Sequence, residues 1–353
     1  MQTSYRLVRL RNGACSVRSL AEDETFHPGI GPAMEAEALY VRQLHLPERV
    51  QKTSGEFGIW DVGLGAAANA LTAIRLIRDG LAASPGWSSR FSVSSNKLKL
   101  ELQHPAPKIL RLVSFDHTTD AASFALEYGA ELGYVAGYEF ALAELVQNHS
   151  VKFSVDSLQV EWTLEPGDFP AWLTQTVVVG ILPAVASGVP PGGKVVGNTA
   201  GAENSGASPG GRMPPSTAGG TPAATPPPHA ILFDPHSPKK NPAMWTVPLF
   251  ADLFRRLDPQ RPCALATFTR STMARAALLL GGFFVGVGHP SGLKEETTVA
   301  ANRPDLLDEP LDHQWLEHAK HSHSAEPLSG PVYRQAPLSP ETWERLRQHP
   351  QFR

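Results

Sequence analysis

The residues best suited to chemistry lie directly after the apolar run at residues 231–233. Asp234 follows this run and opens a polar, proline-rich loop that carries His236. A short apolar run is typical of a buried parallel strand, and ligands of an open α/β sheet bind just beyond the carboxyl ends of its strands. We therefore expect Asp234 to be a catalytic carboxylate, acting either as a general acid or base or as the group that orients an amine. A cap for the following helix is the structural alternative.

A second candidate site is a glycine turn, which contains Asp61, Gly63 and Gly65 and lies between an apolar strand at 57–62 and a helix at 70–78. Such glycines let a ligand approach the backbone, and the helix N-terminus offers unpaired N–H groups. A carboxylate at position 61 would repel a pyrophosphate but would bind the ammonium group of an amino-acid tail. The turn therefore favours S-adenosylmethionine over a dinucleotide as the cofactor. An ordinary strand–helix turn is the alternative.

Two further acids end predicted strands or turns. Asp116 ends the strand at 108–116, at a position where an acid commonly binds the hydroxyls of a ribose. Its separation from the glycine turn exceeds the roughly 20 residues of dinucleotide folds, which we attribute to a polar insertion around residues 88–107. Asp168 is expected near the adenine amino group. Each acid alone could instead be a turn residue.

Composition limits the broad class of protein. The chain has 353 residues, of which 42% are apolar, and a net charge of −3, so it can bury a large core but offers no overall basic field to a nucleic acid. A nucleic-acid partner would have to meet a local basic rim, for which the candidates are Lys239, Lys240, Arg255, Arg256, Arg270 and Arg275. The two cysteines, Cys15 and Cys263, are far apart, which fits a reducing compartment. With no predicted signal peptide or membrane span, we expect a cytoplasmic protein.

The alternation of strands and helices predicts an α/β domain with a mostly parallel central sheet. We place an N-terminal β element at residues 1–22 and the main domain at 23–303. An insertion at 187–228, composed almost entirely of Gly, Pro, Ser, Ala and Thr, is predicted to be disordered. Residues 304–353 are expected to form a loosely attached Pro- and His-rich tail, with one short helix near 340–348. Its histidines lack the partners of a closed metal site, so we expect no metal.

Together these motifs resemble a known family. The pattern Asp61-x-Gly63-x-Gly65 with Asn69 is similar to the E-T-G-F-G-T-G-x-N turn of the MnmC-type methyltransferase domain, which acts in tRNA 5-methylaminomethyl-2-thiouridine biosynthesis. The run from Asp234 through Pro238, Lys240, Asn241, Pro242, Met244 and Trp245 resembles its D-G-F-A-P-x-K-N-P-x-M-W motif. Glu37-Ala-Leu-Tyr40-Val41 and Gly292-Leu-Lys294 resemble its early E-T-x-Y-V and late G-x-K patterns. A second glycine fingerprint is missing, so the resemblance does not extend to the flavin-dependent oxidase half.

The resemblance implies a Rossmann-like class I methyltransferase that uses S-adenosylmethionine and methylates the 5-aminomethyl group of the wobble uridine in tRNA. It implies three groups of site residues: Asp234 and His236 as catalytic; Glu37, Asp61, Gly63, Gly65, Asn69, Asp116 and Asp168 at the cofactor; and Pro238, Lys240, Asn241, Trp245 and Lys294 at the acceptor.

The chain departs from the family pattern at three places. Asp61 replaces the usual Glu, which is a mild change. Ala67 stands where the third glycine is usual, so a β-carbon is expected near the donor. Pro235-His236 replaces Gly-Phe, which leaves the identity of the acceptor open. The alternatives are a methyltransferase for another exocyclic or small-molecule amine, a non-catalytic binding module, and, more weakly, a nicotinamide dehydrogenase. The oligomeric state stays open, with a monomer slightly favoured.

Overall fold

The computed structural model describes residues 4–83, 107–180, 225–292 and 294–353. Most of the predicted disordered insertion at 187–228, and nearly all of the polar insertion at 88–107, lie outside these residues. The core of the fold is an eight-stranded sheet with the order β10-β11-β9-β8-β4-β5-β7-β6. The strands are β4 (Glu56–Val62), β5 (Lys108–Asp116), β6 (Ser150–Val155), β7 (Leu158–Pro166), β8 (Ala230–Phe233), β9 (Ala264–Thr267), β10 (Phe284–Gly288) and β11 (Thr297–Ala301).

The five central strands run parallel, and β6, β10 and β11 pair antiparallel at the two sides. The chain passes from β4 to β5 on one side, whereas β8 and β9 extend the sheet on the other. The carboxyl end of β4 is therefore a topological switch point, where open α/β sheets bind their ligands. The predicted Rossmann-like α/β fold with a mostly parallel sheet is confirmed.

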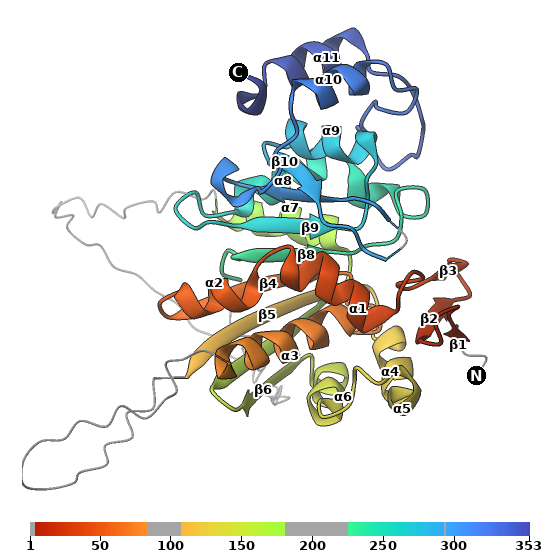
Figure 1. The fold of residues 1–353 in the computed structure, drawn as a ribbon, viewed down its shortest axis with the longest axis vertical. Coiled ribbons are helices and arrows are strands. Elements are labelled where there is room, and N and C mark those ends of the chain that lie inside the picture. The colour runs from red at the N-terminus through yellow and green to blue at the C-terminus, as the bar shows by residue number, and fades with distance from the viewer. Residues whose placement is uncertain (1–3, 84–106, 181–224, 293) are drawn as a thin grey trace, which may run out of the picture.

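Helices cover both faces of this sheet (Figure 1). Side chains alternate across a strand, so that Ile59 and Trp60 of β4 pack into two different apolar clusters. The cluster around Ile59 contains helices α1 (Pro32–Ala36), η1 (Glu37–Arg42), α2 (Leu46–Lys52), α3 (Ala68–Ala82), α4 (Asp120–Glu127), α5 (Gly129–Leu132) and α6 (Glu139–Asn148). The cluster around Trp60 contains α7 (Phe169–Gly180), η3 (Pro242–Trp245), α8 (Val247–Arg256) and α9 (Thr272–Leu280). The chain continues from α1 directly into the π-helical turn η1.

A small antiparallel sheet stands beside the main one, next to α1 and α4 (Figure 1). It consists of β1 (Tyr5–Arg9), β2 (Cys15–Ser19) and β3 (Glu24–Thr25). Asn12 and Gly13 form the turn of the β1–β2 hairpin, where Gly13 has a φ of 87° and Asn12 Oδ1 accepts the Ala14 N–H at 3.1 Å. The third strand reaches Thr25, which lies beyond the element predicted at 1–22.

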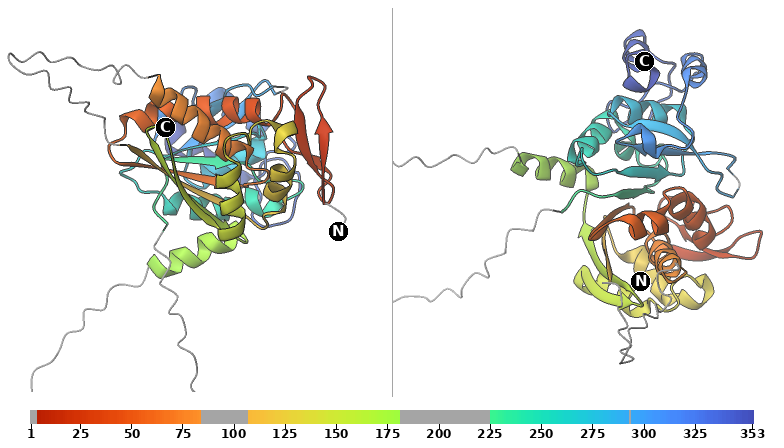
Figure 2. Two further views of the ribbon diagram at one scale, coloured as in Figure 1. Left: turned by 90° about the horizontal axis from the view of Figure 1, so that it is seen from below. Right: turned by 60° about the vertical axis from the view of Figure 1, so that its left-hand side comes forward.

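The carboxyl-terminal segment differs from the loose tail expected from its composition. It forms η4 (Pro304–Leu306), α10 (His313–Lys320), α11 (Pro340–Arg347) and η5 (Pro350–Phe352), with α10 and α11 packed together at one end of the molecule (Figure 2). Leu316, Leu346 and Phe352 are buried, and the Gln351 side chain bonds both backbone groups of Val285 at 2.7 Å. A few buried apolar residues hold this segment against the domain. The polar composition of the segment as a whole does not reveal them. The helix expected near 340–348 is α11.

In the part of the chain that the structure describes, no helix is long and apolar enough to cross a membrane. The same residues contain no group of three or more His, Cys, Asp or Glu side chains arranged to hold a metal ion.

Candidate active site

A cavity of about 870 Å³ lies at the carboxyl ends of β4, β5 and β8. Its size falls within the range of small-molecule and cofactor sites. Residues of β1–β3 and of the loop that follows them form its opposite wall. The cavity brings together nine of the residues predicted from the sequence: Gly63, Gly65, Asn69, Asp116, Asp234, His236, Lys240, Asn241 and Lys294.

The glycine turn lies against the backbone of the Asp234 loop. Gly63 has a φ of 97°, and a β-carbon added there would lie 2.6 Å from the carbonyl oxygen of Asp234. Only glycine fits this position, because both its backbone conformation and the available space exclude a side chain. The same turn thus forms part of the cavity wall and allows the Asp234 loop to approach.

Ala67 also adopts a left-handed conformation, with a φ of 61°, and forms the N-cap of α3. It is fully buried and, among the described residues, does not line the cavity, whereas Ala66 and Ala68 do. The β-carbon expected near the donor therefore faces the protein interior.

Asp61 is only 1% exposed and does not belong to the cavity wall in the described structure. Its Oδ2 accepts a hydrogen bond from the Ser114 hydroxyl at 2.8 Å, and Ser114 Oγ accepts one from Trp162 Nε1 at 2.9 Å. Its Oδ1 is buried without a hydrogen-bond partner among the described residues. Burial raises the pKa of Asp61 to about 8, with the Ser114 hydrogen bond opposing the shift. An ammonium group would satisfy this orphaned oxygen, but Asp61 lies behind the cavity wall, so its role at the donor stays a prediction.

Asp116 ends β5 and lines the cavity, as predicted. Its Oδ2 accepts the backbone N–H of Gly65 at 2.8 Å, which ties the glycine turn to the neighbouring strand. Burial raises the pKa of Asp116, and the hydrogen bond from Gly65 acts against that rise.

Asp168 lies outside the wall of the cavity in the described structure, although its neighbour Gly167 belongs to it. Its Oδ2 accepts the N–H of Ala171 at 2.9 Å in the first turn of α7. Asp168 therefore caps a helix, which is the turn role given as the alternative to adenine binding.

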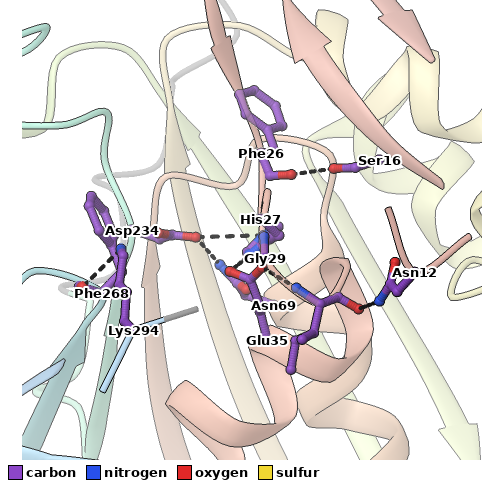
Figure 3. Close-up of polar contacts among 11 residues, drawn as sticks. Asn12, Ser16, Phe26, His27, Gly29, Glu35, Asn69, Asp234, Phe268 and Lys294 are labelled. Carbon is purple, nitrogen blue, oxygen red and sulfur yellow. Dashed lines mark hydrogen bonds and ion pairs between the residues drawn. The ribbon is translucent and has the colours of Figure 1, made fainter. Parts of the chain in front are cut away.

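Asp234 is held by groups from three other elements (Figure 3). Its backbone N–H bonds the Val62 carbonyl at 2.9 Å, and its Oδ2 accepts Nδ2 of Asn69 at 2.7 Å. His27 Nε2 lies 3.7 Å from the same oxygen. Burial, with the nearby carboxylate of Asp234, holds the pKa of the Tyr40 hydroxyl well above its usual range. The Asp234 side chain is 18% exposed, and its carboxylate lines the cavity in an orientation set by these contacts.

His27 and Glu35 were not predicted as site residues. Both line the cavity, and Glu35 Oε1 accepts the backbone N–H groups of Gly29 at 2.5 Å and Ile30 at 3.0 Å. Glu37 was predicted instead, but its carboxylate pairs with Arg42, Nε to Oε1 at 2.8 Å, and is not part of the wall. Residues two apart on a helix point roughly 200° apart, so only one of these two glutamates can face the site. The sequence signal for His27 was a histidine placed directly before the turn at 28–31.

The loop after Asp234 is fixed by Glu24 of the small sheet. Glu24 Oε2 lies 3.1 Å from His236 Nδ1, and its Oε1 accepts the Ser237 hydroxyl at 2.6 Å. Burial acts to raise the pKa of Glu24, but the hydrogen bonds from Ser237 and His236 outweigh it and lower the pKa. Trp245 is fully buried, and its Nε1 donates to the carbonyl of His236 at 2.9 Å. Trp245 therefore supports the loop from the protein interior and does not line the described cavity. Pro238 also lies outside the described cavity wall.

The basic residues divide into two groups. Lys294 enters the cavity, where its Nζ donates to the Phe268 carbonyl at 3.0 Å and lies 4.3 Å from the ring centroid. Burial lowers the pKa of Lys294, and the carboxylates of Asp234 and Glu35 oppose that shift. The predicted basic rim is smaller than expected, because Arg275 is buried against Glu296 and Arg255 pairs with Asp252, while Arg256 lies over the Trp172 ring.

Comparison with known proteins agrees with this geometry. Residues 224–303, which include the whole Asp234 loop, match the family model of S-adenosyl-L-methionine-dependent methyltransferases. The structure of MnmC2 from Aquifex aeolicus superimposes with a TM-score of 0.55 and 16% identity, covering 99% of this chain and 84% of that one. A search of curated protein sequences finds no significant match.

Two other methyltransferase structures are more distant. A precorrin-6y C5,15-methyltransferase from Geobacter metallireducens gives a TM-score of 0.30 and 11% identity, covering 73% of this chain and 86% of that one. A methyltransferase from Agrobacterium tumefaciens gives a TM-score of 0.34 and 10% identity, covering 85% of this chain and 70% of that one.

The fold, the cavity at the switch point and the family match define the chain as an S-adenosylmethionine-dependent methyltransferase. The resemblance to MnmC-type methyltransferase domains is confirmed, since the family match spans the motif at Asp234 and the MnmC2 fold covers nearly the whole chain.

Proposed function

We propose that the protein transfers a methyl group from S-adenosylmethionine to the primary amine of the 5-aminomethyl group on a tRNA wobble uridine. The observation that carries the proposal is the position of Asp234. Asn69 donates a hydrogen bond to its carboxylate at 2.7 Å, and its backbone lies directly against the glycine turn. The likeness to the MnmC2 fold of A. aeolicus and the K-N-P-x-M-W run at 240–245 support the choice of acceptor.

On the donor side, Gly63 and Gly65 leave room for the ligand near the backbone, and Asp116 offers its carboxylate to the ribose. Asp61 would take the ammonium group through its orphaned Oδ1. S-adenosylmethionine, when bound, supplies an electrophilic methyl group on a sulfonium. The protein's main contribution to an in-line displacement is to hold the attacking nitrogen in position.

On the acceptor side, Asp234 would accept a hydrogen bond from the amine and orient its lone pair. Lys240 and Asn241 line the cavity beside it and are placed to meet the nucleotide. Together with Lys239 and Arg270, both exposed, Lys240 forms the remaining basic rim for phosphates.

One observation favours a second candidate, a methyltransferase for a cationic small-molecule amine. The described wall of the cavity carries seven carboxylates, from Glu22, Asp23, Glu24, Glu35, Asp116, Asp120 and Asp234, against three cations, from Arg18, Lys240 and Lys294. This surplus of negative charge attracts a sulfonium and an amine but repels a phosphate backbone.

The nucleoside profile of tRNA from a deletion strain separates these candidates. The proposal expects unmethylated 5-aminomethyl-uridine to accumulate and its methylated form to be lost. An unchanged profile would exclude the tRNA acceptor and favour the small-molecule amine.

A further inference from the structure

His27 occupies a position between two carboxylates at the wall of the cavity. Its Nε2 lies 3.7 Å from Asp234 Oδ2, and its Nδ1 lies 4.0 Å from Glu35 Oε2 (Figure 3). The side chain is only 11% exposed. Glu35 is itself anchored, because its other oxygen accepts two backbone N–H groups from the loop that carries His27. A carboxylate oxygen therefore lies within ion-pair range of each ring nitrogen.

The backbone of His27 supports a functional role. Its φ of 48° lies in the left-handed region, which residues other than glycine seldom adopt. Such conformations persist only where the surrounding structure enforces them, and they concentrate at active sites. Here the conformation coincides with a histidine that lines the cavity.

Methylation of an amine requires a group that takes up a proton, and the other groups in the cavity are less suited to that task. A carboxylate such as Asp234 favours the protonated amine. Lys294 is held as a donor by the Phe268 carbonyl and ring. His236 pairs with Glu24 and makes no ion pair with Asp234 in the described structure. Among the described histidines, His27 is the one with a ring nitrogen in ion-pair range of Asp234.

We propose that His27 accepts the proton that the acceptor amine releases, with Asp234 and Glu35 stabilising the imidazolium; this inference rests on the proposed amine acceptor. As the amine nitrogen bonds to the methyl carbon of the donor, the carbon–sulfur bond breaks and its electron pair stays on sulfur. The methylated nitrogen, now a secondary ammonium, loses one proton to Nε2 of His27. The imidazolium returns that proton to solvent after the product leaves.

Two carboxylates lie beside His27, and Lys294 and Tyr40 interact electrostatically with both of them. Glu35 of α1 and Asp234 after β8 favour the imidazolium, whereas Lys294 before β11 opposes it. Tyr40 of η1 stays neutral, because burial keeps the pKa of its hydroxyl well above the usual range. A proton acceptor must be unprotonated to act, so turnover is expected to fall at acidic pH, and this fall should require His27.

The test compares His27→Asn with wild type. Asparagine tolerates the left-handed backbone but cannot accept the proton. A matched control is His149→Asn, since His149 has a φ of 56° and is exposed at the end of α6. We expect His27→Asn to lower kcat by about 100-fold or more and to remove the acidic limb of the pH profile, with partial rescue by added imidazole. The affinity for S-adenosylmethionine, measured by calorimetry, and the melting temperature should stay unchanged, as should every property of His149→Asn.

Wild-type kcat and an unaltered pH profile in His27→Asn would overturn the inference, and so would a loss fully explained by weaker donor binding. Failure of the wild-type enzyme to methylate 5-aminomethyl-uridine tRNA would instead contradict the proposed acceptor. In that case the same variants are compared with spermidine as the amine, and the inference stands or falls on whether His27→Asn loses that turnover. Absence of wild-type turnover with both amines would contradict the proposed function and this inference together.

Discussion

Asn69 donates a hydrogen bond from its Nδ2 to Oδ2 of Asp234 at 2.7 Å. Asn69 belongs to the first turn of α3, directly after the glycine turn, and Asp234 opens the loop after β8. The contact therefore links the helix after the glycine turn to the Asp234 loop through a single carboxylate oxygen. Under the proposed function, it would let this helix orient the carboxylate that receives the amine.

Removing this contact should lower turnover more than donor binding. A hydrogen bond to a charged group contributes about 1.5–3 kcal/mol, so Asn69→Ala is expected to reduce kcat by about 10- to 100-fold. Steady-state kinetics with calorimetry of donor binding checks the result. Asn148→Ala is the control, since Asn148 makes a similar bond to Glu144 at 2.8 Å on the exposed side of α6. Equal losses in both variants would contradict the role given to Asn69.

Gly63→Ala should destabilise the fold through the Asp234 backbone. The new β-carbon would lie 2.6 Å from the Asp234 carbonyl oxygen, in addition to the cost of a left-handed alanine. We expect a loss of about 3 kcal/mol or more in the free energy of unfolding, measured by urea denaturation. Gly133 also has a positive φ, 73°, but an added β-carbon there would meet no atom within 4 Å. Gly133→Ala should therefore lower the free energy of unfolding by only about 1–2 kcal/mol. Similar losses at both positions would show that the close approach is not needed.

Ala67→Gly should be nearly neutral. Relief of the left-handed alanine, worth about 1–2 kcal/mol, is offset by the lost buried methyl, about 0.8 kcal/mol, and by a more flexible unfolded chain, about 0.4–1 kcal/mol. The free energy of unfolding is therefore expected to change by less than about 1 kcal/mol. Because Ala67 does not line the described cavity, the affinity for S-adenosylmethionine should stay the same. A marked gain in affinity would place the Ala67 methyl against the donor.

Asp61 predicts a pH dependence of stability in the ligand-free protein. Its folded pKa is raised to about 8 by burial, above the unfolded value of 3.8. The folded state therefore holds a proton that the unfolded state releases, so stability falls as the pH rises from about 4 to about 8, by at most about 1.4 kcal/mol per pH unit. The free energy of unfolding, measured by urea denaturation at several pH values in this range, should fall less steeply with pH in Asp61→Asn than in wild type. Identical slopes for both proteins would contradict a protonated Asp61.

The donor side of the site was predictable because its residues follow a local strand–turn–helix order. Gly63, Gly65 and Asn69 are close in sequence, and Asp116 and Asp234 mark the ends of strands adjacent to β4. Hydrophobic periodicity, turn residues and the ends of apolar runs are short-range signals that can be read from a single sequence.

The opposite wall was not predictable, because it depends on long-range docking. Glu24 and His27 reach the cavity only because the small sheet packs over the carboxyl ends of the main strands. Nothing in their local sequence specifies His236 or Asp234 as partners, which lie more than 200 residues away. The same reason explains the C-terminal segment, where Leu316, Leu346 and Phe352 find their partners only in the folded protein.

The most direct measurement of the central claim is methyl transfer by the purified protein. Wild type and Asp234→Ala are incubated with methyl-labelled S-adenosylmethionine and tRNA that carries 5-aminomethyl-uridine, and the nucleosides are analysed by mass spectrometry. We predict that wild type places one labelled methyl on the exocyclic amine, whereas Asp234→Ala binds the donor but forms no labelled nucleoside. Equal labelling by both proteins, or label at another atom of the tRNA, would contradict the account.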